Sequence, residues 1–396
     1  MGPAPYDVVV APRIGFVSAG DSREPTTWSG TPKGLAQGLE QIGVELVRVQ
    51  AAPTAVISGL ALRAVAAARV RPPLDGGLLR AVRRNRDVAI ASREMAALRS
   101  RALAHKLGNA PHLDGLVQIG TEYRIDTALP FVTFEDRTVP QAARSAYSFA
   151  HRLPADVLAD WHARQRWAYE RAVACCMTSS WGAESVVRDF GIAAEKVHSV
   201  GVGRNHSPPP VEREWTTPKF LFVGMEWERK NGPRVLRVFV RLRERLPEAR
   251  LDVVGRHPRI DQDGVTAHGV MRLDVPDERR TVERLFQQAT CFVMPSFQEP
   301  SALAFVEAAA AGLPSIGTTE GGSGDLIGDA GRVVDPADDE ALLAAMTELS
   351  DPGTARELGA LGARRSTLFT WRKVAERTLR ALAPPGVELE RLAPFL

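Results

Sequence analysis

Two glutamates flank an apolar run in the carboxyl half of the chain. Glu299 and Glu307 bound the stretch EPSALAFVE, in which the only other polar residue is Ser301. One interpretation is a helix that buries its apolar side chains and leaves both carboxylates in solvent. The other is that both carboxylates face a cleft and hold one ligand at two separated points. The spacing alone leaves both interpretations open.

Pro300 suits the first position of a helix, so we expect a helix to begin there with Glu299 at or beside its N-cap. Three amides would then be unpaired, those of Ser301, Ala302 and Leu303. Unpaired amides at a helix start form a site for a phosphate. Glu307 would lie about 12 Å along the helix axis from Glu299. That separation suits a nucleoside diphosphate sugar, with one acid at the sugar and the other at the ribose.

A basic pair follows a predicted strand earlier in the same half. Arg229 and Lys230 lie in FVGMEWERKNG, directly after the apolar run KFLFVG. Two cations at the carboxyl end of a strand are well placed to neutralise a leaving diphosphate, whose developing charge needs electrostatic stabilisation. The alternative is ordinary solvated loop charge.

Common nucleotide and hydrolase motifs are absent from the sequence. It contains no GxGxxG, GxxxxGK[ST], HExxH or GxSxG pattern, which argues against a dehydrogenase, a P-loop enzyme, a zincin or an α/β-hydrolase. The three cysteines have no zinc-binding spacing and indicate a reducing compartment. No acid pair suits a metal, so we expect no metal and no cofactor.

Length and composition indicate a two-domain globular protein. The chain has 396 residues, of which 44% are hydrophobic and 24% charged. Its amino terminus lacks a signal peptide pattern, and no apolar run approaches the roughly 20 residues of a membrane span. We therefore expect a cytoplasmic location.

Positive charge is concentrated between Leu60 and Lys106, where eleven Lys and Arg face three acids. The pattern predicts one or two basic amphipathic helices. A solvated helix face is the simpler interpretation. The functional one is peripheral contact with an anionic membrane surface or an anionic acceptor. Nucleic acid is not expected as a partner, because few aromatic residues are interleaved for base stacking.

Short apolar runs alternate with helical patterns along both halves of the chain. The predicted strands include residues 44–49, 113–120, 129–135 and 174–180 in the first half, and 219–224, 249–255, 291–296 and 313–318 in the second. A first strand begins within residues 8–20, and residues 205–218, with three consecutive prolines, read as a linker. We predict two doubly wound α/β domains whose ligands bind beyond the carboxyl ends of the strands.

Taken in order, these motifs resemble the retaining, family-four glycosyltransferases of the GT-B fold. The resemblance runs through FLFVG, KNG, LDVVG, HGV, the stretch from residue 289 to 318, the stretch from 319 to 346, and FTWRKVAERTL. It covers about 160 residues of the carboxyl half. The amino half is similar only in TWSGTPKGLAQGLEQIGVELVRV and SSWGAESVVRDFGIAAEKVHSVGVG.

The resemblance implies roles for individual residues. Lys230 matches the lysine that contacts the donor diphosphate, Glu299 the acid near the donor sugar, and Glu307 the acid on the ribose hydroxyls. The segment Ser301 to Leu303 matches the phosphate cradle. Gly30, in WSGTP, matches the loop that approaches the diphosphate from the amino domain, and Val270, in HGV, a backbone contact to the nucleobase.

The chain also departs from the family pattern. Met225 stands where the family usually has an arginine, a charge that we expect Arg229 to supply instead, and Ser301-Ala302 replaces the frequent Phe-Gly. Where many members carry a histidine, after the strand of residues 129–135, this chain has Glu135 and Asp136. These two are candidates for the acceptor side, or form a turn that pairs with Arg137.

The predicted architecture has three parts. They are an acceptor-binding domain over residues 1–205, a donor-binding domain over 206–372 facing it across a cleft, and a terminal helix and tail over 373–396 that return to the first domain. The expected activity is transfer of a sugar from a nucleotide-diphosphate sugar to an unknown acceptor, with retention. A nucleotide-sugar epimerase of the same fold and a non-catalytic nucleotide-sugar binder are the alternatives.

Overall fold

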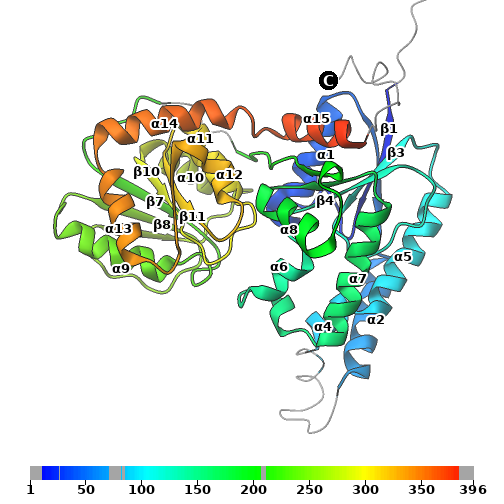
Figure 1. Cartoon of the computed structure of the whole chain (residues 1–396). Coiled ribbons are helices and arrows are strands. Elements are labelled where there is room, and N and C mark those ends of the chain that lie inside the picture. The colour runs from blue at the N-terminus through cyan, green and yellow to red at the C-terminus, as the bar shows by residue number, and fades with distance from the viewer. Residues whose placement is uncertain (1–10, 26, 71–81, 83–84, 207–210, 383–396) are drawn as a thin grey trace, which may run out of the picture. The chain divides into compact units, whose positions relative to one another are not determined.

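The computed structural model describes residues 11–25, 27–70, 82, 85–206 and 211–382 (Figure 1). These residues divide into two compact units. Unit 1 contains the chain up to Thr178, residues Gly182–Val200 and the chain from Trp371 onward. Unit 2 contains Ser179–Trp181 and Gly201–Thr370.

Unit 1 is built on a sheet of six parallel strands in the order β2-β1-β3-β4-β5-β6. The strands are β1 (Arg13–Ser18), β2 (Glu45–Gln50), β3 (Gly115–Ile119), β4 (Phe131–Glu135), β5 (Ala174–Met177) and β6 (Val197–Ser199). Its helices are α1 (Thr31–Gln41), α2 (Ala55–Ala68), α4 (Arg86–Ala91), α5 (Arg93–Gly108), α6 (Val139–Arg144), α7 (Ala155–Arg171), α8 (Ser180–Phe190) and α15 (Trp371–Leu382), with 3₁₀ turns at Thr27–Gly30, Phe149–Arg152 and Ala194–Lys196.

Unit 2 repeats this plan with a second parallel sheet of six strands in the order β12-β11-β10-β7-β8-β9. The strands are β7 (Lys219–Val223), β8 (Arg250–Val254), β9 (Val265–Gly269), β10 (Cys291–Val293), β11 (Ser315–Thr318) and β12 (Gly331–Val334). Its helices are α9 (Gly232–Arg243), α10 (Pro276–Gln288), α11 (Leu303–Ala310), α12 (Ser323–Ile327), α13 (Asp339–Glu348) and α14 (Pro352–Ser366), with a 3₁₀ turn at Gly328–Ala330.

The predicted pair of doubly wound domains is confirmed. Central strands such as β3 and β4 are buried along their whole length, which is why they read as apolar runs and not as alternating patterns. Helices α7 and α14 were not indicated by the sequence patterns, and the first two residues of the HGV segment lie in β9. The described part of the first strand starts at Arg13, and residues 8–10 lie outside the described residues.

The terminal helix returns to unit 1, as predicted. Trp371, at the start of α15, lies against α1, where Gly34 and Gly38 leave room for it. A Cβ added at Gly34 would lie 2.1 Å from the Trp371 ring, and one at Gly38 would lie 2.2 Å from the Trp371 carbonyl oxygen. These two glycines therefore allow the close approach of the two helices.

The predicted linker is attached to unit 2 over its described part. Arg213 donates to the carbonyl oxygens of Phe286 and Gln287 at the end of α10, at 3.1 and 3.0 Å, and to those of Ala311 and Gly312 after α11, at 2.7 and 2.9 Å. A cation that binds the unpaired carbonyls of two helix ends is stabilising. Residues 207–210 lie outside the described residues.

None of the helices in the described part of the chain has both the length and the apolar composition needed to cross a membrane.

Candidate active site

The candidate site lies at the point in the second sheet where the order of strand addition reverses, between β7 and β10. Strand β7 pairs with β8 on one side and with β10 on the other, so the chain proceeds from β7 toward one edge and later from β10 toward the opposite edge. In open parallel sheets, ligands bind beyond the carboxyl ends of the strands at this switch point. The loop after β7 carries Arg229 and Lys230, and the loop after β10 carries Glu299.

The loop after β7 is held in one conformation by Asn231. This residue has a left-handed backbone with φ of 64°, and its side-chain amide donates to the carbonyl oxygens of Pro295 at 3.0 Å and Pro336 at 2.8 Å. The next residue, Gly232, lies under the Trp227 ring, where a Cβ would come within 2.1 Å. The KNG motif therefore fixes where Lys230 points.

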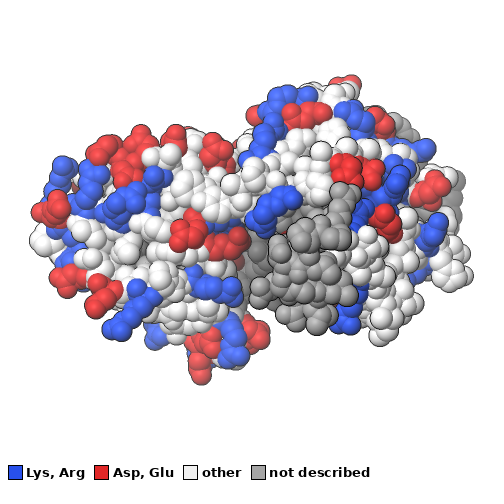
Figure 2. Space-filling view, turned by 90° about the horizontal axis from the view of Figure 1, so that it is seen from below, with Lys and Arg blue, Asp and Glu red and all other residues white. Residues whose placement is uncertain are grey.

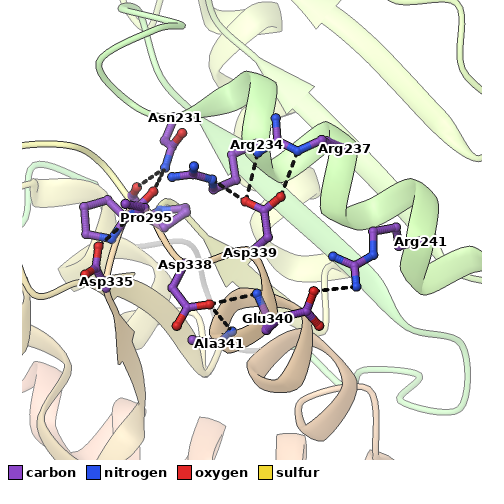
Figure 3. A network of polar contacts seen from close by, with 12 residues as sticks. Asn231, Arg234, Arg237, Arg241, Pro295, Asp335, Asp338, Asp339, Glu340 and Ala341 are labelled. Carbon is purple, nitrogen blue, oxygen red and sulfur yellow. Dashed lines mark hydrogen bonds and ion pairs between the residues drawn. The ribbon is translucent and has the colours of Figure 1, made fainter.

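Helix α9 is further anchored to α13 by ion pairs (Figure 3). Arg234 and Arg237 both bind the carboxylate of Asp339, at 2.5 and 2.8 Å, and Arg241 binds Glu340 at 2.7 Å. The hydrogen bonds of Arg237 are the largest of the effects that hold the pKa of Asp339 below its usual value. This network stabilises the helix that begins at Gly232, two residues after Lys230.

Three groups converge on one carboxylate oxygen of Glu299. Its Oε2 binds the ammonium group of Lys230, lies 3.5 Å from Nη1 of Arg229, and accepts a hydrogen bond from the Ser296 hydroxyl at 3.2 Å. Arg229 also donates to the Gln298 carbonyl oxygen at 2.7 Å. Lys230 and Glu299 are 69 residues apart in sequence. The predicted basic pair and the predicted acid thus form one cluster.

The cluster is charged and shielded from solvent. The side chains of Lys230 and Glu299 are 12% and 6% exposed. Burial lowers the pKa of Lys230, against the opposing attraction of Glu299. Burial also acts to lower the pKa of Arg229, but its hydrogen bonds and charge interactions with Glu226 and Glu299 together raise it. Charges held in such a site interact strongly with a bound anion because little water screens them.

The helix after β10 begins at Leu303 and not at Pro300, which corrects the predicted position of Glu299. The backbone N–H of Glu299 donates to the Glu320 carbonyl at 2.9 Å, and its carbonyl accepts from the Gly322 N–H at 2.9 Å. This bridge pairs Glu299 with another loop, and the helix begins four residues later, so Glu299 is not its N-cap. Ala302 takes the N-cap position without a side-chain hydrogen bond.

This shift changes which backbone amides are available. Leu303 and Ala304 now supply the first-turn amides, while Ser301 lies in the non-helical segment before the helix. The amide of Phe305 donates to Ala302 at 3.2 Å. The estimate of helix rise between the two glutamates also fails, because Glu299 lies outside the helix that contains Glu307.

Glu307 lines a cavity of about 150 Å³ at the carboxyl ends of β7 and β8. The lining also includes Val223, Gly224, Met225, Val254, Gly255, Met271 and Leu273, together with residues of α10 and His206. Burial raises the pKa of Glu307 to about 7, although its carboxylate accepts hydrogen bonds from the backbone N–H groups of His206 and Asn205. The cavity is smaller than the 300–1,000 Å³ of typical ligand sites and fits one part of a nucleotide.

Val270 and Met225 do not take the positions that the family resemblance implies for the donor site. Val270 is 47% exposed and does not line the cavity, whereas its neighbour Met271 does. Met225, which replaces the family arginine, is 49% exposed and borders the cavity. Arg229 does not replace that arginine freely, because its guanidinium already binds Glu226 in two hydrogen bonds of 2.9 and 3.0 Å.

Gly30 lies in unit 1 and forms the N-cap of α1, with φ of 83°. The two residues before it, Trp28 and Ser29, also have left-handed backbones, with φ of 45° and 54°. Such conformations cost non-glycine residues roughly 1–2 kcal/mol each. Strain of this kind is often stored in loops that contact ligands.

Glu135 is buried inside unit 1, where it has no open face toward an acceptor. Only 5% of the residue is exposed. Its carboxyl oxygens receive hydrogen bonds from Thr121 at 2.7 Å, Gln165 at 3.0 Å and Tyr169 at 2.5 Å. Burial raises its pKa to about 8, although these hydrogen bonds act in the opposite direction. Asp136 is half-buried beside it.

Several site residues were not singled out from the sequence. Asn231 was visible within the KNG motif, but its two carbonyl partners lie 64 and 105 residues away. Ser296 contacts Glu299 within the loop after β10, whereas the Gly321-Gly322 pair contacts it only because two separate loops meet. No group of three or more His, Cys, Asp or Glu suited to a metal occurs within the described ranges.

Part of the chain is similar in sequence to known glycosyltransferases. Residues 217–351 match the family model described as Glycosyl transferases group 1. The chain is 28% identical over 216 residues to an MMP alpha-(1->4)-mannosyltransferase of Mycolicibacterium hassiacum, covering 51% of each chain. It is 28% identical over 234 residues to a glycogen synthase of Mycobacterium tuberculosis, covering 55% of each. The matched regions span about half the length of these relatives.

Solved structures show the fold over nearly the whole chain. A sucrose-phosphate synthase of Thermosynechococcus elongatus superposes with a TM-score of 0.63 at 18% identity, covering 93% of this chain and 98% of that one. WaaG, a glycosyltransferase involved in lipopolysaccharide biosynthesis, gives 0.59 at 16% identity, covering 94% and 100%. The fold is GT-B, and residues 217–351 match the model of the group 1 glycosyltransferase family. The predicted resemblance is confirmed.

Proposed function

We propose that this protein is a retaining glycosyltransferase that moves a sugar from a nucleotide-diphosphate sugar to an acceptor. The observation that carries the proposal is the convergence of Lys230 and Arg229 on Glu299 at the switch point of the second sheet. The family match over the same residues supports it.

The cluster suits a leaving diphosphate. In the transfer, the bond from the sugar C1 to the diphosphate oxygen breaks and that oxygen takes the electron pair. A bond then joins C1 to the acceptor oxygen, which loses its proton. Lys230, Arg229 and the amides of Leu303 and Ala304 stabilise the charge that develops on the diphosphate. Glu299 keeps both cations in place before the donor binds and orients the sugar hydroxyls.

The cavity at Glu307 suits the nucleoside. A carboxylate accepts hydrogen bonds from both ribose hydroxyls, and the apolar lining from β7, β8 and Met271 suits a base. Unit 2 is thus the donor-binding domain and unit 1 the acceptor-binding domain, and the strained loop at Gly30 keeps the role that the family resemblance implies for it, contact with the donor diphosphate. We propose that the reaction needs no metal, since the charge compensation comes from the two cations.

Peripheral membrane contact is the second part of the proposal. Helix α2 exposes Val56, Ile57 and Leu60, which are 71%, 49% and 62% exposed. Arg63 follows on the same helix and Arg69 is its C-cap, both within the basic stretch 60–106. Exposed apolar side chains beside basic ones are typical of helices that lie in a membrane interface. Residues 71–81, 83 and 84 of that stretch lie outside the described residues.

The first experiment is a donor screen. The protein is incubated with UDP-, GDP-, ADP- and TDP-sugars, with and without EDTA, and the products are separated. Release of nucleoside diphosphate that is insensitive to EDTA is expected for one donor. Isomerised donor would instead indicate an epimerase. A raised melting temperature with no turnover in the presence of any tested acceptor would indicate a non-catalytic binder.

The membrane proposal is tested by sedimentation with vesicles of phosphatidylcholine alone or with an equal amount of phosphatidylglycerol. The wild type is expected in the pellet only with the anionic lipid. The double variant Ile57→Ser, Leu60→Ser is expected to stay in the supernatant. Equal recovery of the wild type with both vesicles would contradict anionic membrane contact.

A further inference from the structure

A hollow in unit 1 lies between α5 and α7 and is closed at one side by the loop after β3. On the face seen in Figure 2, charges of both signs are interspersed. This hollow departs from that pattern, because five arginines and two aspartates line it. They are Arg93, Arg101, Arg124, Arg164, Arg171, Asp126 and Asp160.

Arg164 is the unusual member of this set. It is 5% exposed, and one terminal nitrogen, Nη2, donates to the Ala91 carbonyl oxygen at 2.5 Å. Its Nε and Nη1 have no hydrogen-bond partner among the described residues. Burial lowers the pKa of Arg164 to about 10, so it stays cationic at neutral pH. A buried guanidinium with unused donors is costly unless a ligand binds them.

The neighbouring arginines are held by a shared aromatic ring. The guanidinium of Arg124 lies 5.2 Å from the centroid of the Trp167 ring, and that of Arg171 lies 4.9 Å from it. The backbone N–H of Arg124 also donates to the Ser100 hydroxyl at 2.9 Å, which fixes the loop after β3 on α5. Cation–π contacts orient both side chains without using their N–H donors.

We propose that this hollow is a binding site for a phosphate monoester, carried by a small sugar or by a lipid headgroup. Guanidinium forks match phosphate oxygens, and a monoester carries about −1.5 to −2 charges at pH 7. That charge offsets most of the excess of arginine over aspartate. The hollow measures about 480 Å³, which is within the range of small-molecule sites, so it admits an organic group attached to the phosphate.

This site is separate from the proposed donor site. All of its residues belong to unit 1, whereas the Glu299 cluster and the Glu307 cavity belong to unit 2. The inference therefore does not depend on glycosyl transfer, and its test measures binding and not turnover. Two sources of the phosphate are compared directly: a soluble phosphate monoester and a lipid with the same head chemistry.

The soluble source is tested by calorimetric titration at fixed ionic strength with glucose 6-phosphate, and with glucose as the neutral counterpart. The wild type is expected to bind the phosphate ester and not glucose. Arg124→Gln and Arg171→Gln are each expected to weaken binding about tenfold or more, because each removes a charge-assisted hydrogen bond. Arg152→Gln, which changes an exposed arginine outside the hollow, is the matched control and should bind as the wild type does.

The lipid source is tested with vesicles of phosphatidylcholine alone or with an equal amount of phosphatidic acid. If the ligand is a lipid, Arg124→Gln and Arg171→Gln sediment less than the wild type and Arg152→Gln, while glucose 6-phosphate binds weakly to all. The proposal is overturned if neither probe binds, or if the two hollow variants bind both probes as Arg152→Gln does. Arg164→Gln is added with a melting curve. If Arg164→Gln does not fold, Arg124→Gln and Arg171→Gln, which change exposed arginines, still test the proposal.

Discussion

Two buried carboxyl groups follow strands of the two sheets, and their surroundings give them opposite properties. Glu135 ends β4 in unit 1, and Glu299 follows β10 in unit 2; each is 5% exposed. Glu135 is surrounded by neutral donors, and burial raises its pKa to about 8. Glu299 is bound by a lysine and an arginine. Burial of an acid therefore does not by itself indicate a reactive site; its partners decide whether it is charged.

The largest expected effect comes from the cationic partner in unit 2. Lys230→Met should lower turnover of the donor by about a hundredfold to a thousandfold, the typical cost of removing one group that stabilises developing charge. The matched control is Lys219→Met, at the amino end of β7, which should turn over as the wild type does. Steady-state release of nucleoside diphosphate measures both. Equal rates in the two variants would remove Lys230 from the chemistry.

Replacing each acid with glutamine should lower the free energy of unfolding by different amounts at the two sites. Glu299→Gln leaves two cations without their shared partner and should lower the free energy of unfolding by about 3 kcal/mol or more at pH 7. Glu135→Gln keeps a neutral group of the same shape among the same donors and should cost less than about 1 kcal/mol. Urea denaturation measures both. Similar losses would show that the contrast between the two sites is wrong.

The pH dependence of stability should depend on Glu135. Its pKa is raised from 4.5 to about 8 on folding, so the folded state holds a proton that the unfolded state releases. Its contribution to stability is complete below about pH 4.5 and is lost as the pH rises through about 8, with a slope of at most about 1.4 kcal/mol per pH unit. Glu135→Gln should flatten that slope, as urea midpoints over this range would show. An unchanged slope would contradict the raised pKa.

The smallest expected effect concerns Glu307. Because its pKa lies at about 7, half of the free protein is protonated there, and donor binding should tighten as the pH rises from 6 to 8. At pH 7 the gain still available from full ionisation is about twofold. Glu307→Gln should bind the donor more weakly and without this pH dependence. Calorimetric titration with the donor found in the screen, at several pH values, measures this dependence. If the variant keeps the pH dependence of the wild type, another group is responsible for it.

The sequence patterns predicted much of unit 2 because local and global signals agree there. The strand–loop–helix units at KFLFVG and CFVMPS are each encoded within about twenty residues, and Lys230, Glu299 and Glu307 lie within them. The start of the helix after β10 was predicted at Pro300, because proline locally favours the first position of a helix. In the folded chain this local preference is overridden by the bridge between Glu299 and the Gly321-Gly322 segment, which no local pattern shows.

In unit 1, local patterns were less informative. Glu135 was proposed for the acceptor side because it stands where many members of the resembled family carry a histidine, but three side chains from other segments enclose it. The hollow at Arg164 is likewise formed by side chains from segments that are distant in sequence. Its arginines come from α5, α7 and the loop between β3 and β4, and only the first group lies in the basic stretch that the sequence analysis noted.

The amino-acid sequence by itself determined the two parallel sheets, the acids and cations at the ends of their strands, and the family resemblance, because each depends on residue types within a short stretch. Only the tertiary structure decided which acid is charged, where the helix after β10 begins, and that five arginines line one hollow. Those properties depend on burial and on partners from distant segments, and neither exists until the chain has folded.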